Sequence, residues 1–252
     1  MNDEKHLVIS DCHVTADQNL DRFDWLAELI RDIEPTKIIC IGDFASLDSL
    51  STHHSPGSKT DHDLPSFRAE QAAVSTALEK MFKYDPMCDT IMLMGNHEQR
   101  WDRFKERFPK ILDHVDIEEW LGYTGYWDFI HPYKDWAEID GLMYTHVPHT
   151  IMGKPIGGAN ACRSVAMQST KSVIFGHTHT LNVATIPFIN GTGQRMAMSV
   201  PAFMNDGNVE PYAQGLPTGW AYGVMLIRPQ GPERLPSYEY VSMQDLRSEY
   251  EV

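Results

Sequence analysis

Residues 90–98 read Thr-Ile-Met-Leu-Met-Gly-Asn-His-Glu, and this stretch decides how the chain should fold. The apolar run 90–94 is typical of a buried strand, and it stops abruptly at Gly95. Three polar residues follow at once, Asn96, His97 and Glu98, which can ligate a metal ion or move a proton. In open α/β sheets, ligands bind outside the carboxyl ends of the strands. The stretch therefore predicts a buried strand with a chemical site directly after it.

The residues before this stretch predict a parallel sheet. Residues 5–10 form a short β-rich run, residues 37–41 form a second apolar run, and residues 21–33 between them carry apolar side chains at helical spacing. A strand, a helix and a strand in this order imply parallel pairing and a right-handed crossover. The same patterns predict helices over 67–83, 101–108 and 160–169, and strands over 142–145 and 171–175. Short runs over 182–189, 195–200 and 221–227 predict antiparallel strands of a second sheet.

Five predicted strands end in residues that commonly ligate metals. These residues are Asp11 and His13; Asp43; Asn96 and His97; His146; and His177 and His179. One histidine at a strand end is usually structural, but five strands that end this way indicate a shared site. Alternate residues of an extended segment point to the same side, so each pair spaced by two residues could face one ion.

These blocks resemble the calcineurin-like metallophosphoesterase family, and in particular its small prokaryotic or phage-type members. The family order is Asp-x-His, Gly-Asp, Gly-Asn-His-Asp/Glu, His and Gly-His-x-His. In this chain the blocks stand in the same order at residues 11–13, 42–43, 95–98, 146 and 176–179. The resemblance is specific because all five blocks are present, each at a predicted strand end.

The resemblance implies an α/β fold, a four-layer α-β-β-α sandwich of two mixed β-sheets flanked by helices, with two divalent metal ions at the carboxyl ends of the strands. Asp11, His13 and His179 would hold the first ion, Asn96, His146 and His177 the second, and Asp43 would bridge both. The mixed carboxylate, amide and imidazole ligand set suits Mn, Fe, Zn, Ni or Co better than Ca. The resemblance leaves the identity of the ions open; Mn²⁺ is our first expectation, with Fe, Zn, Ni, Co or Mg as alternatives.

The resemblance also implies the roles of individual residues in phosphoester hydrolysis. A water between the two ions, as hydroxide, would attack phosphorus. Asp43, as the bridging ligand, and His97, which would protonate the leaving oxygen or steady the transition state, are the expected catalytic residues. Asn96 and Arg100 are the expected substrate-binding residues. Glu98 and Asp48 are alternative acidic partners for His97.

Three functions remain open at the level of the sequence. We favour a phosphodiesterase that acts on a nucleotide or a nucleic-acid end. The alternatives are a phosphomonoesterase acting on a small phosphorylated metabolite and a non-catalytic, metal-binding interaction scaffold. A protein phosphatase of this superfamily is disfavoured, because those enzymes carry an arginine before Gly-Asn-His-Glu where this chain has Met94.

The 252 residues fit a single metallophosphoesterase domain over 1–252. Two segments lack periodicity: residues 44–66, which we expect to form a lid loop and which include His53, His54 and Asp61, and residues 111–140, which we expect to form a small insertion. Specificity is expected to lie in these two segments.

Composition and net charge limit the binding partners and the cellular compartment that we expect for this protein. The net charge is -14, from 35 acidic and 21 basic residues, so broad binding to duplex DNA is not expected. The four cysteines form no Cys-x-x-Cys pair, and we expect buried free thiols in a reducing compartment. Neither a signal peptide nor a long apolar run is evident, so we expect a cytoplasmic protein without membrane contact.

Overall fold

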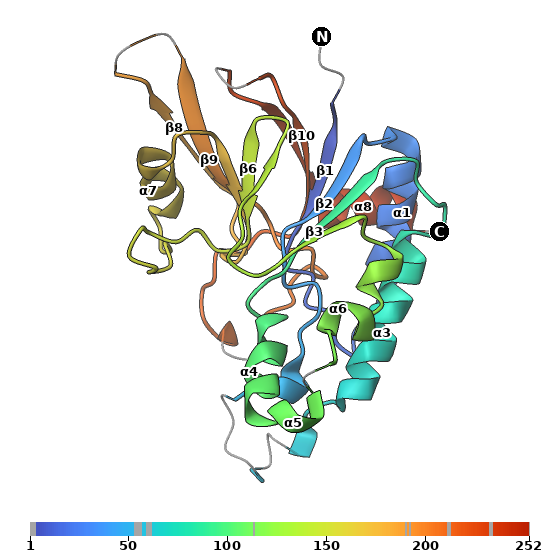
Figure 1. Ribbon diagram of the computed structural model, residues 1–252. Coiled ribbons are helices and arrows are strands. Elements are labelled where there is room, and N and C mark those ends of the chain that lie inside the picture. The colour runs from blue at the N-terminus through green and yellow to red at the C-terminus, as the bar shows by residue number, and fades with distance from the viewer. Residues whose placement is uncertain are drawn as a thin grey trace.

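The computed structural model describes residues 4–52, 57–58, 62–112, 114–189, 191, 193–210, 213–231 and 234–251. Two β-sheets pack face to face, and helices cover their outer faces (Figure 1). The predicted His53, His54 and Asp61 of the lid loop lie outside the described residues. Among the described residues, no helix is long and apolar enough to cross a membrane.

The first sheet has six strands in the order β11-β10-β1-β2-β3-β4. Its strands are β1 (His6–Ile9), β2 (Lys37–Cys40), β3 (Asp89–Leu93), β4 (Phe129–His131), β10 (Gly223–Arg228) and β11 (Ser237–Ser242). Strands β1 to β4 pair in parallel, whereas β10 and β11 are antiparallel additions at the β1 edge. The parallel centre confirms the strand-helix-strand prediction. It also means that β1, β2 and β3 all end at the same edge of the sheet.

The second sheet has five strands in the order β5-β6-β7-β9-β8. Its strands are β5 (Ala137–Ile139), β6 (Leu142–Thr145), β7 (Val173–Phe175), β8 (Asn182–Pro187) and β9 (Gln194–Ser199). The prediction of a second sheet is correct for β8 and β9, but it is wrong for residues 221–227. That run forms β10, which pairs with β1 and extends the first sheet. The prediction failed because the apolar pattern of a short strand is the same in either sheet.

The helices complete four layers, as predicted. They are α1 (Asp21–Ile33), α3 (Phe67–Met81), α4 (Gln99–Arg107), α5 (Pro109–Leu112), α6 (Ile117–Trp120), α7 (Ala161–Gln168) and α8 (Met243–Tyr250), with short 3-10 turns η1 (Asp48–Leu50) and η2 (Tyr123–Gly125). Helices α1, α3 and α8 cover the first sheet, and α7 covers the second (Figure 1). The order of layers is helix, sheet, sheet, helix.

Alternation along the strands explains how both faces of the first sheet are buried. In β1, Leu7 and Ile9 pack against the helices, while Val8 packs between the two sheets. In β2, Ile38 packs against the helices and Ile39 packs between the two sheets. Because successive side chains point to opposite faces, a sheet covered on both sides requires a continuous apolar run. This is why the strands read as uninterrupted hydrophobic stretches.

The two segments for which we expected a lid loop (44–66) and a small insertion (111–140) are built into the fold more closely than that expectation implies. Residues 44–47 are buried, and η1 follows them, so the start of the predicted lid belongs to the core. Residues 111–140 contain β4 and β5, the edge strands of the two sheets, and therefore form part of the sandwich and not a separate insertion. Their strands are only 3 residues long, too short for a periodic pattern to show.

The side chain of Arg22 in α1 is fully buried and contacts the loop that follows β1. Its guanidinium donates to the carbonyl oxygens of Asn19 (2.8 Å), Cys12 (3.1 Å) and Phe203 (3.1 Å). Burial lowers the pKa of Arg22 to about 10, so the group stays charged at neutral pH. Arg22 thus fixes the backbone between Asp11 and His13 from behind.

The Arg22→Met variant should lower the free energy of unfolding by about 2–4 kcal/mol, because it leaves buried carbonyl groups without donors. Urea denaturation followed by circular dichroism measures the change. The Arg31→Met variant on the same helix is the matched control, because the Arg31 side chain is 53% exposed and its solvent-screened ion pairs should contribute little to stability. Equal losses in the two variants would contradict the structural role given to Arg22.

Candidate metal centre

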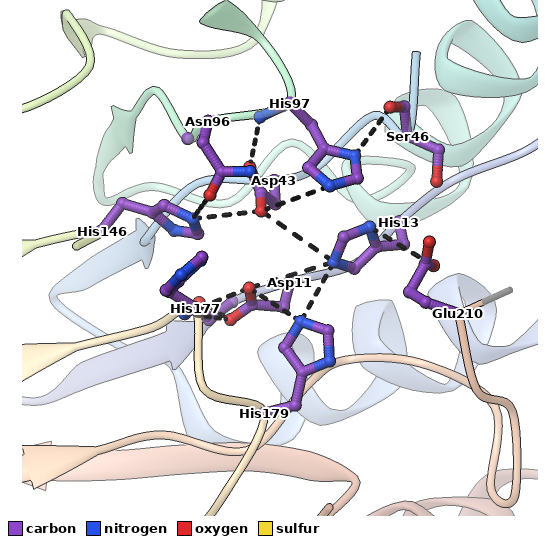
Figure 2. A network of polar contacts seen from close by, with 12 residues as sticks. Asp11, His13, Asp43, Ser46, Asn96, His97, His146, His177, His179 and Glu210 are labelled. Carbon is purple, nitrogen blue, oxygen red and sulfur yellow. Dashed lines mark hydrogen bonds and ion pairs between the residues drawn. The ribbon is translucent and has the colours of Figure 1, made fainter. Parts of the chain in front are cut away.

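The ligand-type residues of all five predicted blocks meet at one place (Figure 2). Three of the loops follow β1, β2 and β3 of the first sheet, and two follow β6 and β7 of the second sheet. Since strands within each parallel set end at the same edge, the packing of the two sheets brings these five loops together. The site therefore lies where the carboxyl ends of both sheets meet.

The backbone at this site is not extended, which corrects the reasoning from alternate residues. Asp11, His13, Asp43, His177 and His179 all have positive φ angles, between 44° and 68°. Residues other than glycine rarely adopt this left-handed conformation, and such strain concentrates at functional sites. The pairs reach the site because the loops turn sharply, and His177 and His179 consequently point into different clusters.

The first cluster contains Asp11, His13 and His179, whose ligand atoms lie within 4.8 Å of one another. Nε2 of His179 is 3.2 Å from Oδ1 of Asp11 and 3.1 Å from Nε2 of His13. Two buried imidazole nitrogens this close cannot both carry protons without repulsion. The donor set therefore fits a cation between the two rings.

The second cluster contains Asp43, His146 and His177, also within 4.8 Å. Nε2 of His146 is 3.1 Å from Oδ2 of Asp43 and 3.1 Å from Oδ1 of Asn96. His177 is the exposed member of the set. Asp43 also lies 4.0 Å from His13, so it stands between the two clusters.

The buried carboxylates and imidazoles of this site shift each other's pKa. Burial by itself would lower the pKa of His146, but the carboxylates of Asp43 and Asp11 and the hydrogen bond to the Ile41 carbonyl together outweigh burial and raise this pKa to about 10. Burial would likewise raise the pKa of Asp43, but His146 and His97 hold it well below the usual range. In the absence of metal, protons on histidines compensate the buried carboxylates. Divalent cations would compensate them more directly.

Side chains of neighbouring loops approach Gly95 and Gly176 so closely that only glycine fits at these two positions. A Cβ atom on Gly95 would lie 2.0 Å from Oδ1 of Asp43, and one on Gly176 would lie 2.1 Å from Oγ of Ser10. Neither glycine has a positive φ angle. These glycines therefore admit side chains of neighbouring loops.

Glu98 proves to be a buried structural carboxylate and not a partner of His97. It accepts hydrogen bonds from the backbone N–H groups of Asp43 (3.0 Å), Ala45 (3.1 Å) and Gly95 (2.8 Å) and from the hydroxyl group of Tyr123 (3.2 Å). This one side chain thus ties the loop after β2 to the loop after β3. This arrangement supports the position of Asp43.

The Glu98→Gln variant should lose about 1–3 kcal/mol of folding free energy, because its amide NH₂ group would face N–H donors. The Tyr123→Phe variant is the matched control, since it removes only one of the four donors and should lose less. Chemical denaturation of both variants compares the two losses. A smaller loss for Glu98→Gln than for Tyr123→Phe would contradict the role of the carboxylate.

His97 lies between the two clusters of candidate metal ligands and the guanidinium group of Arg100. Its backbone N–H donates to Oδ1 of Asp43 (2.8 Å), and its Nδ1 donates to the carbonyl oxygen of Ser46 (2.7 Å). Arg100 lies 3.3 Å from Nε2 of His97 and donates to Ser46 and Asp48, each at 2.8 Å. Asp48, the second expected partner of His97, thus reaches it only through Arg100. Cys12 is buried and packs in the hydrophobic core between the first sheet and its helices.

Two neighbours of the site were not found by sequence reasoning. Ser10 donates to Oδ2 of Asp11 (2.5 Å), and Glu210 lies 3.5 Å from Nδ1 of His13. A serine before a strand end is too common to be a signal. Glu210 lies in a segment without periodicity, far from the recognised blocks.

A further group of possible ligands, Glu4, His6 and Asp140, does not form a comparable centre. The ammonium group of Lys37 lies 3.0 Å from Glu4 and 3.1 Å from Asp140. The lysine already supplies the positive charge that a metal ion would bring. All four cysteines are free, as expected; Cys12, Cys40 and Cys162 are buried, and Cys88 is half-buried.

Comparisons with known proteins agree with the motifs. The family model described as calcineurin-like phosphoesterase matches residues 5–181. No curated protein matches the chain in sequence. Solved structures similar to the chain include a single mutant of Vps29 from Entamoeba histolytica, with 13% identity, a TM-score of 0.39, and coverage of 94% of this chain and 98% of that one. Wild-type Vps29 from the same organism, complexed with zinc, has 13% identity, a TM-score of 0.36, and coverage of 95% and 99%. The match over residues 5–181, which includes all five motif blocks, shows that the chain belongs to the calcineurin-like phosphoesterase family.

Proposed function

We propose that this protein hydrolyses phosphodiesters with two divalent metal ions, and that its substrate is a nucleotide or a nucleic-acid end. The observation that carries the proposal is the pair of carboxylate-imidazole clusters, buried except for His177, with Asp43 between them. Asp11, His13 and His179 would hold one ion, and Asn96, His146 and His177 the other. Asp43 would serve both.

The donor set combines carboxylate, amide and imidazole groups, which suits a first-row transition ion better than Ca²⁺, and we take manganese as the first candidate. When bound, two such ions polarise the phosphate and acidify a water molecule. The protein residues position these groups. Ser10 and the backbone N–H of His177 hold the Asp11 carboxylate, and the carbonyl of Ile41 fixes the His146 ring.

His97 would act on the leaving oxygen. Its Nδ1–H donates to Ser46, so its Nε2 faces the space beside Asp43 and would be the nitrogen that acts on the leaving oxygen, giving it a proton when the ring is protonated or steadying its charge. Arg100 contacts the same nitrogen and brings positive charge to the place where a phosphate would sit. Asn96 would combine its role as ligand with contact to the substrate.

One observation supports a phosphodiester over a phosphomonoester, and a second supports a nucleotide as the substrate. Arg100 is already paired with Asp48 at 2.8 Å, so less of its charge is available to balance a dianion. The centroid of the Trp220 ring lies 4.3 Å from that of the His179 ring, and the centroid of the Tyr133 ring lies 6.4 Å from that of the His146 ring. Aromatic rings on both sides of the site suit stacking with bases.

The test compares bis-p-nitrophenyl phosphate with p-nitrophenyl phosphate after chelation and reloading with Mn²⁺. We expect the chelated protein to be inactive and the reloaded protein to prefer the diester. A strong preference for the monoester would refute the diesterase assignment. No turnover of any phosphoester by the metal-loaded protein would favour a scaffold.

A further inference from the structure

Glu210 is a buried carboxylate outside the family motifs. It comes from the connection between β9 and β10, beyond residues 5–181, and is 6% exposed. Its Oε1 atom lies 3.5 Å from Nδ1 of His13, on the side of the ring that faces away from the two clusters (Figure 2). A carboxylate is rarely buried in this way without a specific partner.

Two other histidine rings of the site, those of His146 and His97, show how a partner on the outer nitrogen positions a ring; Nδ1 of His179, like that of His13, is buried without a hydrogen-bond partner among the described residues. Nδ1 of His146 donates to the carbonyl of Ile41 at 2.6 Å, and Nδ1 of His97 donates to the carbonyl of Ser46 at 2.7 Å. In both rings the outer nitrogen is anchored, and Nε2 is left to face Asp43 at 3.1 and 4.0 Å. The backbone thus fixes the orientation and the proton position of these two rings.

His13 has no such backbone anchor. Its Nδ1 atom is buried and, within the described part of the chain, has no hydrogen-bond partner at normal distance. Its Nε2 atom points into the site, 3.1 Å from Nε2 of His179 and 4.0 Å from Oδ1 of Asp11. Glu210 is the acid that faces the outer nitrogen, and a short movement would close the 3.5 Å separation.

We propose that Glu210 is a positioning residue for the first metal ion: its carboxylate accepts a hydrogen bond from the Nδ1–H of His13 and so leaves the Nε2 lone pair directed at the metal. Carboxylates behind metal-bound histidines fix the tautomer and the ring, and they increase ligand basicity. The inference rests on the proposed metal centre. It adds to that centre a residue from the C-terminal part of the chain.

The test is metal binding, measured by titration calorimetry of metal-free protein with Mn²⁺. The Glu210→Ala variant should bind one of its two ions about 10–100-fold more weakly and keep the other near the wild-type affinity. The Glu210→Gln variant keeps an acceptor oxygen and should lose less. The Asp206→Ala variant is the matched control, because Asp206 is an exposed acid of the same connection, paired with Gln244, and should bind as wild type does.

A second measurement does not depend on a variant. Nitrogen NMR of the wild-type protein loaded with diamagnetic Zn²⁺ should show His13 protonated at Nδ1, with the proton in a strong hydrogen bond. Two ions bound by Glu210→Ala with wild-type affinities would overturn the inference, as would His13 protonated at Nε2. If the wild type bound no metal, the proposed function itself would fail, so the two failures are distinguishable.

Discussion

The Asp43→Asn variant is expected to lose at least one of the two metal ions and to hydrolyse the diester at least about 10³-fold more slowly. Asp43 stands between the clusters, 3.1 Å from His146 and 4.0 Å from both His13 and His97. An amide in its place removes the charge that both ions would share. It also places an NH₂ group where a metal or the imidazole of His146 would lie.

Metal content and turnover are measured on the same preparation, by elemental analysis after gel filtration and by release of p-nitrophenol under Mn²⁺. The Asp89→Asn variant is the control, because Asp89 begins β3 at the opposite end of the sheet and is exposed. Asp43→Asn protein that kept both ions and near-normal turnover would exclude Asp43 as the shared ligand.

The His97→Ala variant is expected to keep both ions and to lower kcat by about 10²–10⁴-fold, the usual contribution of a positioned acid or base. Its Nε2 atom contacts Arg100 at 3.3 Å and lies 4.0 Å from Asp43, while its backbone N–H already binds Asp43. The side chain can therefore be removed without removing that backbone contact.

Substrates with different leaving groups sharpen this test. If His97 acts on the leaving oxygen, the loss should be larger for a poor leaving group, such as an alcohol, than for p-nitrophenol. His131→Ala is the control, because that histidine lies in β4 and pairs with Asp135. A loss of metal in His97→Ala would instead assign the residue to the ligand set, which its proximity to His13 and Asp43 allows.

The layers of the fold could be predicted because buried parallel strands and amphipathic helices leave clear patterns. The runs 5–10, 37–41 and 90–94 each gave a strand of the first sheet. What failed was the assignment of short strands to sheets. β10 joins β1 through backbone hydrogen bonds, which depend on the whole packing and not on its own sequence. β11 and α8 were not predicted at all.

The members of the site could be predicted from strand ends, but their geometry could not. Left-handed backbone at five ligand-type residues follows from tertiary contacts, such as the hydrogen bonds from Asp11 and His13 to the loop after β2. Glu98 stands in the motif, yet its role became visible only when its donors were placed around it. Glu210 has no motif of its own, because contact between distant segments alone brings it to His13.

The central claim is that one set of residues, drawn from the loops after five strands, holds two ions on either side of Asp43. Anomalous diffraction from crystals loaded with Mn²⁺ tests it most directly. We expect two manganese peaks about 3.5–4 Å apart, one beside Asp11, His13 and His179 and the other beside Asn96, His146 and His177, with Asp43 touching both. A single peak, or none at these residues in fully loaded crystals, would contradict the account.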